Sequence, residues 1–234
     1  MHVGGEQAGP GQSQLATIRE RIAAAAAQAG RAAAEVTLIA VSKMQPPERI
    51  EAVLADGQRI FGENYVQEAA GRWPAHREIY PDLEIHLIGA LQSNKALDAA
   101  RLFDVIQTLD RPKLATALAK AFERLGHARP LYIEVNTGGE AQKAGIRPEE
   151  LDAFVSHCRR DLGLSIAGLM AIPPAGDDVA PHTAFLGRLA ERNGIERLSI
   201  GMSADFETAI RFGATHVRVG SALFGERSPR KVEA

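Results

Sequence analysis

The residue of this sequence best placed for covalent chemistry is Lys43, which follows the apolar run 38–42. Side chains alternate along a strand, so Ile39, Val41 and Lys43 are expected to share one face, and both faces are apolar before Lys43. Strands of this kind belong to parallel sheets covered by helices, in which ligands bind at the carboxyl ends of the strands. A lysine at such an end can form a Schiff base with an aldehyde. The alternative is a lysine that only ends a strand and extends to water.

Three polar side chains in other apolar runs are expected on the interior face of the same sheet. Arg218 lies in the last of these runs, and Glu134 and His86 lie in two earlier ones. Inward polar groups are costly unless they serve a ligand or one another. The spacing therefore predicts that a lysine, an arginine, a glutamate and a histidine converge. For Glu134 a buried ion pair is an equal alternative, whereas for Arg218 we favour a role in binding.

Two late loops combine glycine with serine in a way that suits a phosphate group. The first is Gly-Met-Ser-Ala-Asp at 201–205, and the second is Gly-Ser-Ala-Leu-Phe-Gly at 220–225. Glycine allows close backbone approach, backbone amides bind anions, and the hydroxyls of Ser203 and Ser221 can donate to oxygen. We also expect Ser203 to cap the helix that follows it. In a barrel, the loops after the seventh and eighth strands often hold phosphate.

An aldehyde that carries a phosphate could bridge Lys43 and these two loops, which are neighbours where a barrel closes. Pyridoxal 5'-phosphate (PLP) meets that description. Arg218 beside the ring would have a chemical effect, because a guanidinium keeps its proton and cannot share it with the pyridine nitrogen. The ring nitrogen would then stay unprotonated and the cofactor would be a poor electron sink.

The order of the segments predicts one α/β domain. Strand-like runs alternate with amphipathic helical patterns along the whole chain, and a helical stripe at 15–29 precedes the first strand. Eight such units fit a (β/α)8 TIM barrel with an extra N-terminal helix. An open doubly wound sheet is the alternative, but the turn at 42–46 lacks the glycines of a nucleotide-binding loop. The expected strands are 38–43, 59–61, 84–89, 104–108, 131–136, 165–170, 197–200 and 215–219.

The sequence predicts a short tail outside the domain at each end. Residues 1–14 are rich in glycine and glutamine and lack the apolar stretch of a signal peptide or membrane span. We therefore expect a disordered tail at 1–14, a barrel domain at 15–228 and a C-terminal tail at 229–234. The single cysteine, Cys158, excludes a disulfide framework and a cysteine metal site, and as a buried residue it fits a cytoplasmic protein.

Charge and composition limit the partners. The formal net charge is -2 at pH 7, and no basic block with interleaved aromatic residues occurs. Binding to nucleic acid or to a membrane surface therefore has no electrostatic basis. We expect a small-molecule ligand, no metal, and a monomer or weak dimer.

Seven segments carry recognisable motifs, at 40–43, 61–68, 86–95, 135–136, 168–170, 201–203 and 216–221. Together they resemble those of the pyridoxal phosphate homeostasis protein family, which is related to the N-terminal barrel of alanine racemase, the fold of type III PLP proteins. The resemblance covers nearly the whole chain. It implies that Lys43 holds PLP as an aldimine and that Arg218 lies near the pyridine nitrogen. It further implies that Ser203, Gly220 and Ser221 bind the phosphate, and that Asn64, His86 and Met202 lie in motifs lining the pocket.

For function, the resemblance implies a protein of intracellular PLP homeostasis that buffers the cofactor or delivers it to apo PLP-dependent enzymes. A PLP-dependent racemase-like enzyme or a Schiff-base aldolase is the alternative, and an interaction protein with an inert barrel is a third. Alanine racemase needs a second, C-terminal β domain with a tyrosine acid/base, whereas this sequence ends shortly after Gly225. We therefore expect a carrier without turnover of its own.

Overall fold

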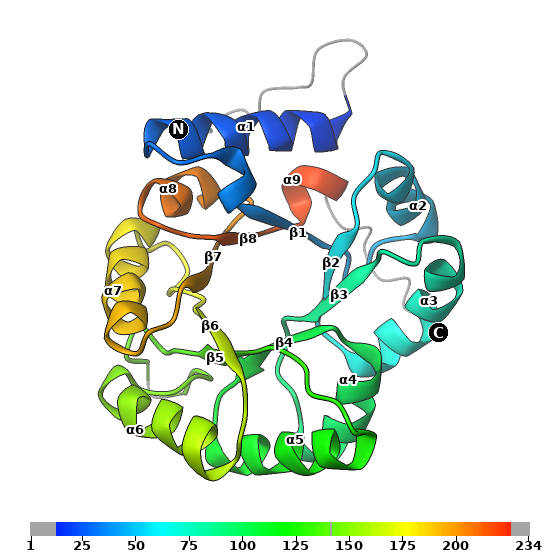
Figure 1. The fold of residues 1–234 in the computed structure, drawn as a ribbon. Helices are drawn as coiled ribbons and strands as arrows, with labels where there is room; N and C mark the ends of the chain where they lie inside the picture. Colours follow the sequence, from blue (N-terminus) through cyan, green and yellow to red (C-terminus); the bar gives the residue numbers. More distant parts are fainter. Residues whose placement is uncertain (1–12, 141, 226–234) are drawn as a thin grey trace.

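The computed structural model describes residues 13–140 and 142–225, which form a closed barrel of eight parallel strands surrounded by helices (Figure 1). Consecutive strands are neighbours, and the last pairs with the first to close the barrel. The predicted (β/α)8 barrel is confirmed, and the open doubly wound sheet is excluded. The strands are β1 (Thr37–Val41), β2 (Ile60–Glu63), β3 (Glu84–Leu87), β4 (Val105–Leu109), β5 (Leu131–Glu134), β6 (Ile166–Met170), β7 (Arg197–Met202) and β8 (His216–Val219).

The helices cover the outside of the barrel, and the predicted extra N-terminal helix is present. This helix, α1, packs against α8 and α9, beside the β1–β8 seam (Figure 1). Within the described ranges, no helix is both long and apolar enough to cross a membrane. The helices are α1 (Gln14–Gln28), α2 (Pro47–Ala55), α3 (Val66–Ile79), α4 (Ala96–Leu102), α5 (Pro112–Leu125), α6 (Leu151–Ser156), α7 (Val179–Arg192), α8 (Phe206–Arg211) and α9 (Ser221–Phe224), with short turns η1 (Ala33–Glu35), η2 (Ser93–Lys95), η3 (Pro148–Glu150) and η4 (His157–Asp161).

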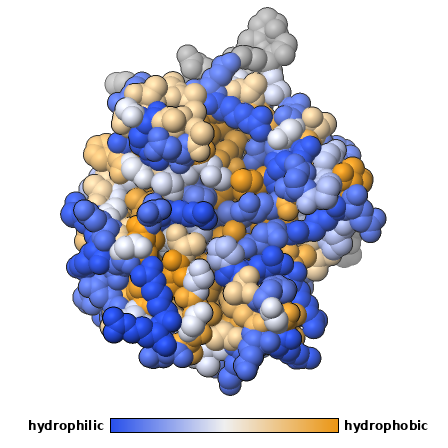
Figure 2. Space-filling view, viewed as in Figure 1, coloured by the Kyte–Doolittle hydropathy of each residue, from blue (hydrophilic) through white to orange (hydrophobic). Residues whose placement is uncertain are grey.

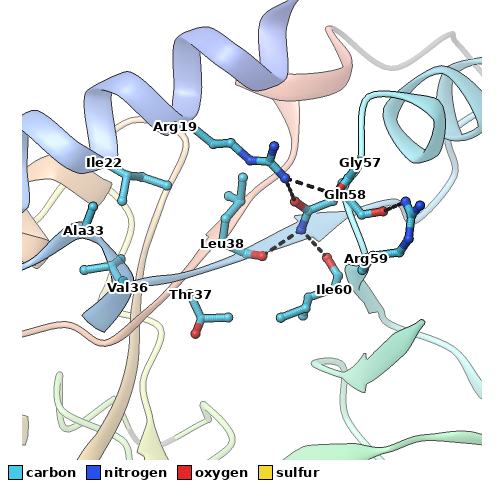
Figure 3. Close-up of a pocket in the computed structure, with 11 residues that line it drawn as sticks. Arg19, Ile22, Ala33, Val36, Thr37, Leu38, Gly57, Gln58, Arg59 and Ile60 are labelled. Atoms are coloured by element: carbon cyan, nitrogen blue, oxygen red, sulfur yellow. Dashed lines mark hydrogen bonds between the residues drawn. The ribbon is translucent and has the colours of Figure 1, made fainter. Parts of the chain in front are cut away.

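A buried glutamine ties α1 to the amino ends of β1 and β2. The side-chain amide of Gln58 donates to the carbonyls of Leu38 (2.9 Å) and Ile60 (2.7 Å), and its oxygen accepts from Arg19 of α1 (3.4 Å) (Figure 3). Arg19 also donates to the carbonyl of Gly57 (3.1 Å). These bonds satisfy backbone carbonyls that the ladder between β1 and β2 does not reach, because the register of that pair begins at Ala40.

The apolar side chains form two separate regions. The larger lies between the strands and the helices and contains Leu38, Ala40 and the predicted buried Cys158. Burial raises the pKa of the Cys158 thiol to about 12, so this group is not reactive at neutral pH. The smaller region contains Val105, Tyr132 and Met170, from β4, β5 and β6. On the surface seen in Figure 2, hydrophilic residues spread across the whole face, with smaller hydrophobic patches between them.

Several polar side chains are buried among the described residues, and His216 is one of them. The hydroxyl of Tyr132 lies 3.1 Å from Nε2 of His216, and Thr215 Oγ1 lies 2.8 Å from its Nδ1. Burial lowers the pKa of His216 to about 3, so the ring is neutral at pH 7. These groups satisfy one another, as buried polar groups must.

The predicted tails fall mostly outside the described residues. Ser13 caps α1 by accepting from the amide of Ala16 (3.2 Å), and Gln14 is the first residue of the helix. The last two residues of the predicted tail at 1–14 are therefore the N-cap and the first residue of α1, and residues 1–12 lie outside the described residues. The tail at 229–234 lies outside the described residues, and both domain boundaries stay predictions.

Gly89 offers a test of how tightly the carboxyl ends of β2 and β3 are packed. A Cβ at this position would lie 2.3 Å from the carbonyl oxygen of Asn64 and 2.6 Å from its Cα. Gly89→Ala is therefore expected to reduce the free energy of unfolding by about 1–3 kcal/mol, measured by urea denaturation. The matched control is Gly71→Ala in α3, where a Cβ meets no atom within 4 Å. It should stabilise the protein by about 0.5–1 kcal/mol. A Gly89→Ala protein as stable as the wild type would contradict the packing.

Candidate functional site

A cavity of about 320 Å³ lies at the carboxyl ends of the strands, where barrel proteins bind their ligands. It brings together residues from both ends of the chain, because β1 and β8 lie side by side (Figure 1). Seven of the eight predicted site residues line it, and His86 does not. The lining residues are Val41, Lys43, Asn64, Ile88, Ile172, Met202, Ser203, Ala204, Arg218, Gly220 and Ser221.

A larger cavity of about 530 Å³ lies at the opposite end of the barrel, between α1 and the amino ends of β1 and β2 (Figure 3). Its cations are already engaged: Arg19 binds Gly57 and Gln58, and Arg59 binds Asp82 at 3.1 Å. The smaller cavity differs from it in bringing together a lysine, serine hydroxyls and a buried arginine at the carboxyl ends of the strands.

Lys43 lies in a turn two residues beyond β1 and is half-buried. The next residue, Met44, has a φ of 57°, which makes it the one non-glycine residue with positive φ in the described ranges. Such a conformation costs on the order of 1–3 kcal/mol and persists only where neighbours enforce it. Here the Met44 amide donates to Glu68 of α3 (2.8 Å), and Arg72 binds the same carboxylate (3.1 Å). The turn that carries Lys43 is thus held from α3.

A fully buried carboxylate, Glu63 at the end of β2, fixes the other side of this turn. It accepts from the hydroxyl of Ser42 (2.9 Å), from Nε1 of Trp73 (3.1 Å) and from Arg72. Burial raises its pKa, and the charge of Arg72 opposes that rise. Arg72 also donates to the carbonyl of Ser42 (3.2 Å). Sequence reasoning missed Glu63 and Arg72 as supports of Lys43, although Glu63 lies within a motif that carried the resemblance.

The two glycine and serine loops join through one hydroxyl. Ser203 Oγ accepts from the amide of Gly220 (3.2 Å) and from that of Ala222 (3.3 Å). The prediction that Ser203 caps the following helix is wrong: the N-cap of α8 is Asp205, whose carboxylate accepts from the amide of Met202 (2.6 Å). Ser203 instead orients the first turn of α9. A hydroxyl that accepts two bonds still has its own proton to donate, so Ser203 keeps a donor for a ligand.

Arg218 is 4% exposed and forms part of the wall of the cavity. One terminal nitrogen donates to the carbonyl and the hydroxyl of Ser199 (both 2.7 Å), and the other donates to the carbonyl of Ala171 (2.9 Å). These bonds use three of its five N–H groups, and two remain. Burial lowers its pKa to about 10, opposed by the charge of Glu134, so Arg218 remains a cation at pH 7.

The predicted convergence of four charged or titratable groups is only partly present. Lys43 and Arg218 line one cavity, whereas His86 and Glu134 are not among the residues that line it. Burial raises the pKa of Glu134 to about 7, the charge of Asp110 raises it further, and Arg218 opposes both. His86 lies deeper in the barrel, with its ring bonded to Glu84 and a glutamine.

Comparison with known proteins identifies the family. The model of the alanine racemase N-terminal domain matches residues 13–228. A pyridoxal phosphate homeostasis protein of Vibrio cholerae is 41% identical over 228 residues, which cover 92% of this chain and 96% of that protein. The chain belongs to the pyridoxal phosphate homeostasis protein family. The Escherichia coli K12 member of that family is also 41% identical, over 93% of this chain and 97% of its own length.

Solved structures agree with this assignment. PipY of Synechococcus elongatus without PLP is 37% identical, with a TM-score of 0.78, over 91% of this chain and 98% of its own. The structure of PipY with PLP bound is 38% identical, with a TM-score of 0.74, over 89% of this chain and 100% of its own. Alanine racemase of Corynebacterium glutamicum shares the fold, with a TM-score of 0.63 at 20% identity, and this chain covers 62% of it.

Proposed function

We propose that this protein binds pyridoxal 5'-phosphate reversibly through Lys43 and serves intracellular homeostasis of the cofactor, either by buffering it or by delivering it to apoenzymes. The observation that carries the proposal is the placement of Lys43, a hydroxyl and amide cradle, and a buried arginine around one cavity of about 320 Å³. The family name and the PLP-bound structure of PipY support it. A cytoplasmic location and a monomer or weak dimer remain predictions.

The residues of the cavity fit both ends of such a ligand. When bound, PLP would supply an aldehyde able to form a C=N bond with a primary amine, with release of water. Lys43 contributes the amine, from a turn that Glu68 and Arg72 hold in place. Ser203 and Ser221 contribute hydroxyl donors to the phosphate, and Gly220 allows its close approach to the backbone at the start of α9.

Arg218 would face the ring between these two ends. Its pKa of about 10 keeps the guanidinium charged at pH 7, and its two remaining N–H groups can donate to a pyridine nitrogen. A donor of this kind favours an unprotonated ring nitrogen and so weakens the cofactor as an electron sink. Asn64 and Met202 complete the wall, while a direct contact from His86 stays a prediction.

The first test concerns Lys43. Borohydride reduction of protein incubated with PLP, followed by peptide mass mapping, should locate the modification on Lys43 because its amine lines the cavity. Lys43→Ala should lose the absorbance of the bound Schiff base. The matched control is Lys113→Ala, since Lys113 lies exposed in the first turn of α5, and it should keep that absorbance. A modified peptide that lacks Lys43 would refute the assignment.

The second test separates phosphate binding from ring binding. Loss of the Ser221 hydroxyl removes one charge-assisted hydrogen bond, which is worth about 1.5–3 kcal/mol. Ser221→Ala should therefore weaken PLP binding roughly tenfold to a hundredfold and leave pyridoxal, which lacks the phosphate, nearly unaffected. Ser165→Ala, at an exposed position before β6, is the control. Equal losses for PLP and pyridoxal in Ser221→Ala would count against this role.

The composition of the cavity wall favours a carrier over an enzyme. Among the described residues, Lys43 and Arg218 are the ionisable groups of the lining, and the wall has no carboxylate, histidine, cysteine or tyrosine. Racemisation needs proton transfer on two faces of the substrate, and aldol chemistry needs a base besides the amine that binds the aldehyde. The wall therefore supports binding and exchange of the cofactor better than turnover.

A measurement of hydrogen exchange can decide this point. In heavy water, protein saturated with PLP should give no multiple-turnover deuterium incorporation at the α-carbon of L-alanine, followed by NMR. The physical reasons are the weak electron sink beside Arg218 and the shortage of acid/base groups around Lys43. Incorporation over many turnovers that vanishes in Lys43→Ala would instead support the racemase-like alternative.

A further inference from the structure

A continuous chain of hydrogen bonds crosses the interior of the barrel from the cavity to the opposite end. Arg218 on β8 donates to Ser199 Oγ on β7 (2.7 Å), and that hydroxyl donates to Gln107 Oε1 on β4 (2.6 Å). Gln107 Nε2 lies 2.8 Å from His86 Nδ1 on β3, and His86 Nε2 lies 2.6 Å from Glu84 Oε1. The four inner members are at most 4% exposed, whereas 44% of the Glu84 side chain is exposed.

The chemistry of each member gives this chain one direction. A hydroxyl can donate one hydrogen bond, so Ser199 donates to Gln107 and accepts from Arg218. The amide of Gln107 then donates to His86 Nδ1, which must be the unprotonated nitrogen of the ring. His86 Nε2 therefore carries the proton of the ring and donates a hydrogen bond to Glu84. The hydrogen bond to His86 lowers the pKa of Glu84, as expected for an ionised acceptor.

This polar chain stands where barrels usually pack layers of branched apolar side chains. Buried polar groups cost free energy unless each is paired, so a chain with every member satisfied needs several matched residues at once. Its inner end is Arg218, the cation of the cavity wall, and no inner member other than Arg218 lines the cavity. The chain can therefore act on a ligand only through Arg218.

We propose that Ser199, Gln107 and His86 are positioning residues that hold the guanidinium of Arg218 in the orientation in which its two remaining N–H groups face the cavity. Gln107 Oε1 accepts the hydrogen bond that the Ser199 hydroxyl donates, so this hydroxyl can only accept from Arg218. His86 in turn fixes the amide of Gln107. The identity of the ligand rests on the proposed function, whereas the hold on Arg218 does not.

The first experiment examines the ligand-free protein. Rotation about the Cζ–Nη bonds of Arg218 is measured by NMR of its guanidinium nitrogens, assigned by their loss in Arg218→Lys. Ser199→Ala and Gln107→Met should speed this rotation at least roughly threefold, because each removes or loosens one acceptor. Ser199→Thr keeps a hydroxyl and should restore slow rotation. Unchanged rotation in both Ser199→Ala and Gln107→Met overturns the proposal.

Tyr132→Phe is the matched control for disturbance of the barrel interior. It removes another buried hydrogen bond, from Tyr132 to His216, that is not part of the chain. It should leave the rotation of Arg218 unchanged. If it speeds the rotation as much as Ser199→Ala does, the effect is general loosening of the core and the proposal fails.

The second experiment adds the cofactor. With PLP labelled by ¹⁵N in the ring, Ser199→Ala and Gln107→Met should shift the ring-nitrogen signal toward that of free PLP and weaken binding roughly threefold to tenfold. Tyr132→Phe and Ser199→Thr should match the wild type. A wild type that fails to bind PLP would refute the proposed function, while the rotation of Arg218 would still decide the inference. If Ser199→Ala and Gln107→Met speed the rotation of Arg218 as expected but leave the ring-nitrogen signal unchanged, the hold on Arg218 does not affect the ligand. That result would overturn the claim that these residues position Arg218 for ligand binding.

Discussion

The pairing of β8 with β1 is the constraint on which the site depends. Its register sets Ile39 opposite Arg218 and Ala40 opposite Val219, so the end of β1 runs directly beside Gly220. A Cβ on Gly220 would lie 3.4 Å from that of Val41, which shows how closely the two chain segments approach. An amine from the start of the chain and a set of donors from its end thereby share one cavity. Because α1 packs over this seam, the helix that precedes the barrel also supports the site.

Much of this arrangement could be predicted from the sequence, because the signals are local. Each strand is a short apolar run, and the run before Lys43 is apolar on both faces, which is typical of a parallel sheet covered by helices. A glycine followed within two residues by a serine, at 201–203 and at 220–221, predicted the two loops that line the cavity. Lys43 was expected as the last residue of the first strand; it lies instead in a turn two residues beyond β1, at the same end of the barrel. These features need no knowledge of distant contacts.

The rest could not be predicted, because it depends on pairs of residues from different strands. Alternation indicates which face a side chain takes but not its depth along the barrel axis, so His86 was expected near the ligand and lies deeper. Ser203 reads as a helix cap in its own loop, yet its partners are amides of the loop after β8. The sequence gives no signal for Gln107 and Ser199, because their role depends on a hydrogen bond between β4 and β7.

The interior of the barrel fits the proposed role of a cofactor carrier on a fold shared with alanine racemase. A carrier needs an amine that bonds reversibly, donors for the phosphate and a ring environment that does not promote reaction. The wall of the cavity meets these needs with Lys43, the cradle after β8 and a charged guanidinium. The other titratable side chains near it are either committed to one another, as His86 is to Glu84, or lie outside the wall, as Glu134 does. Among the described residues, the ionisable groups of the cavity wall are thus Lys43 and Arg218, a composition that fits the proposed role as a carrier.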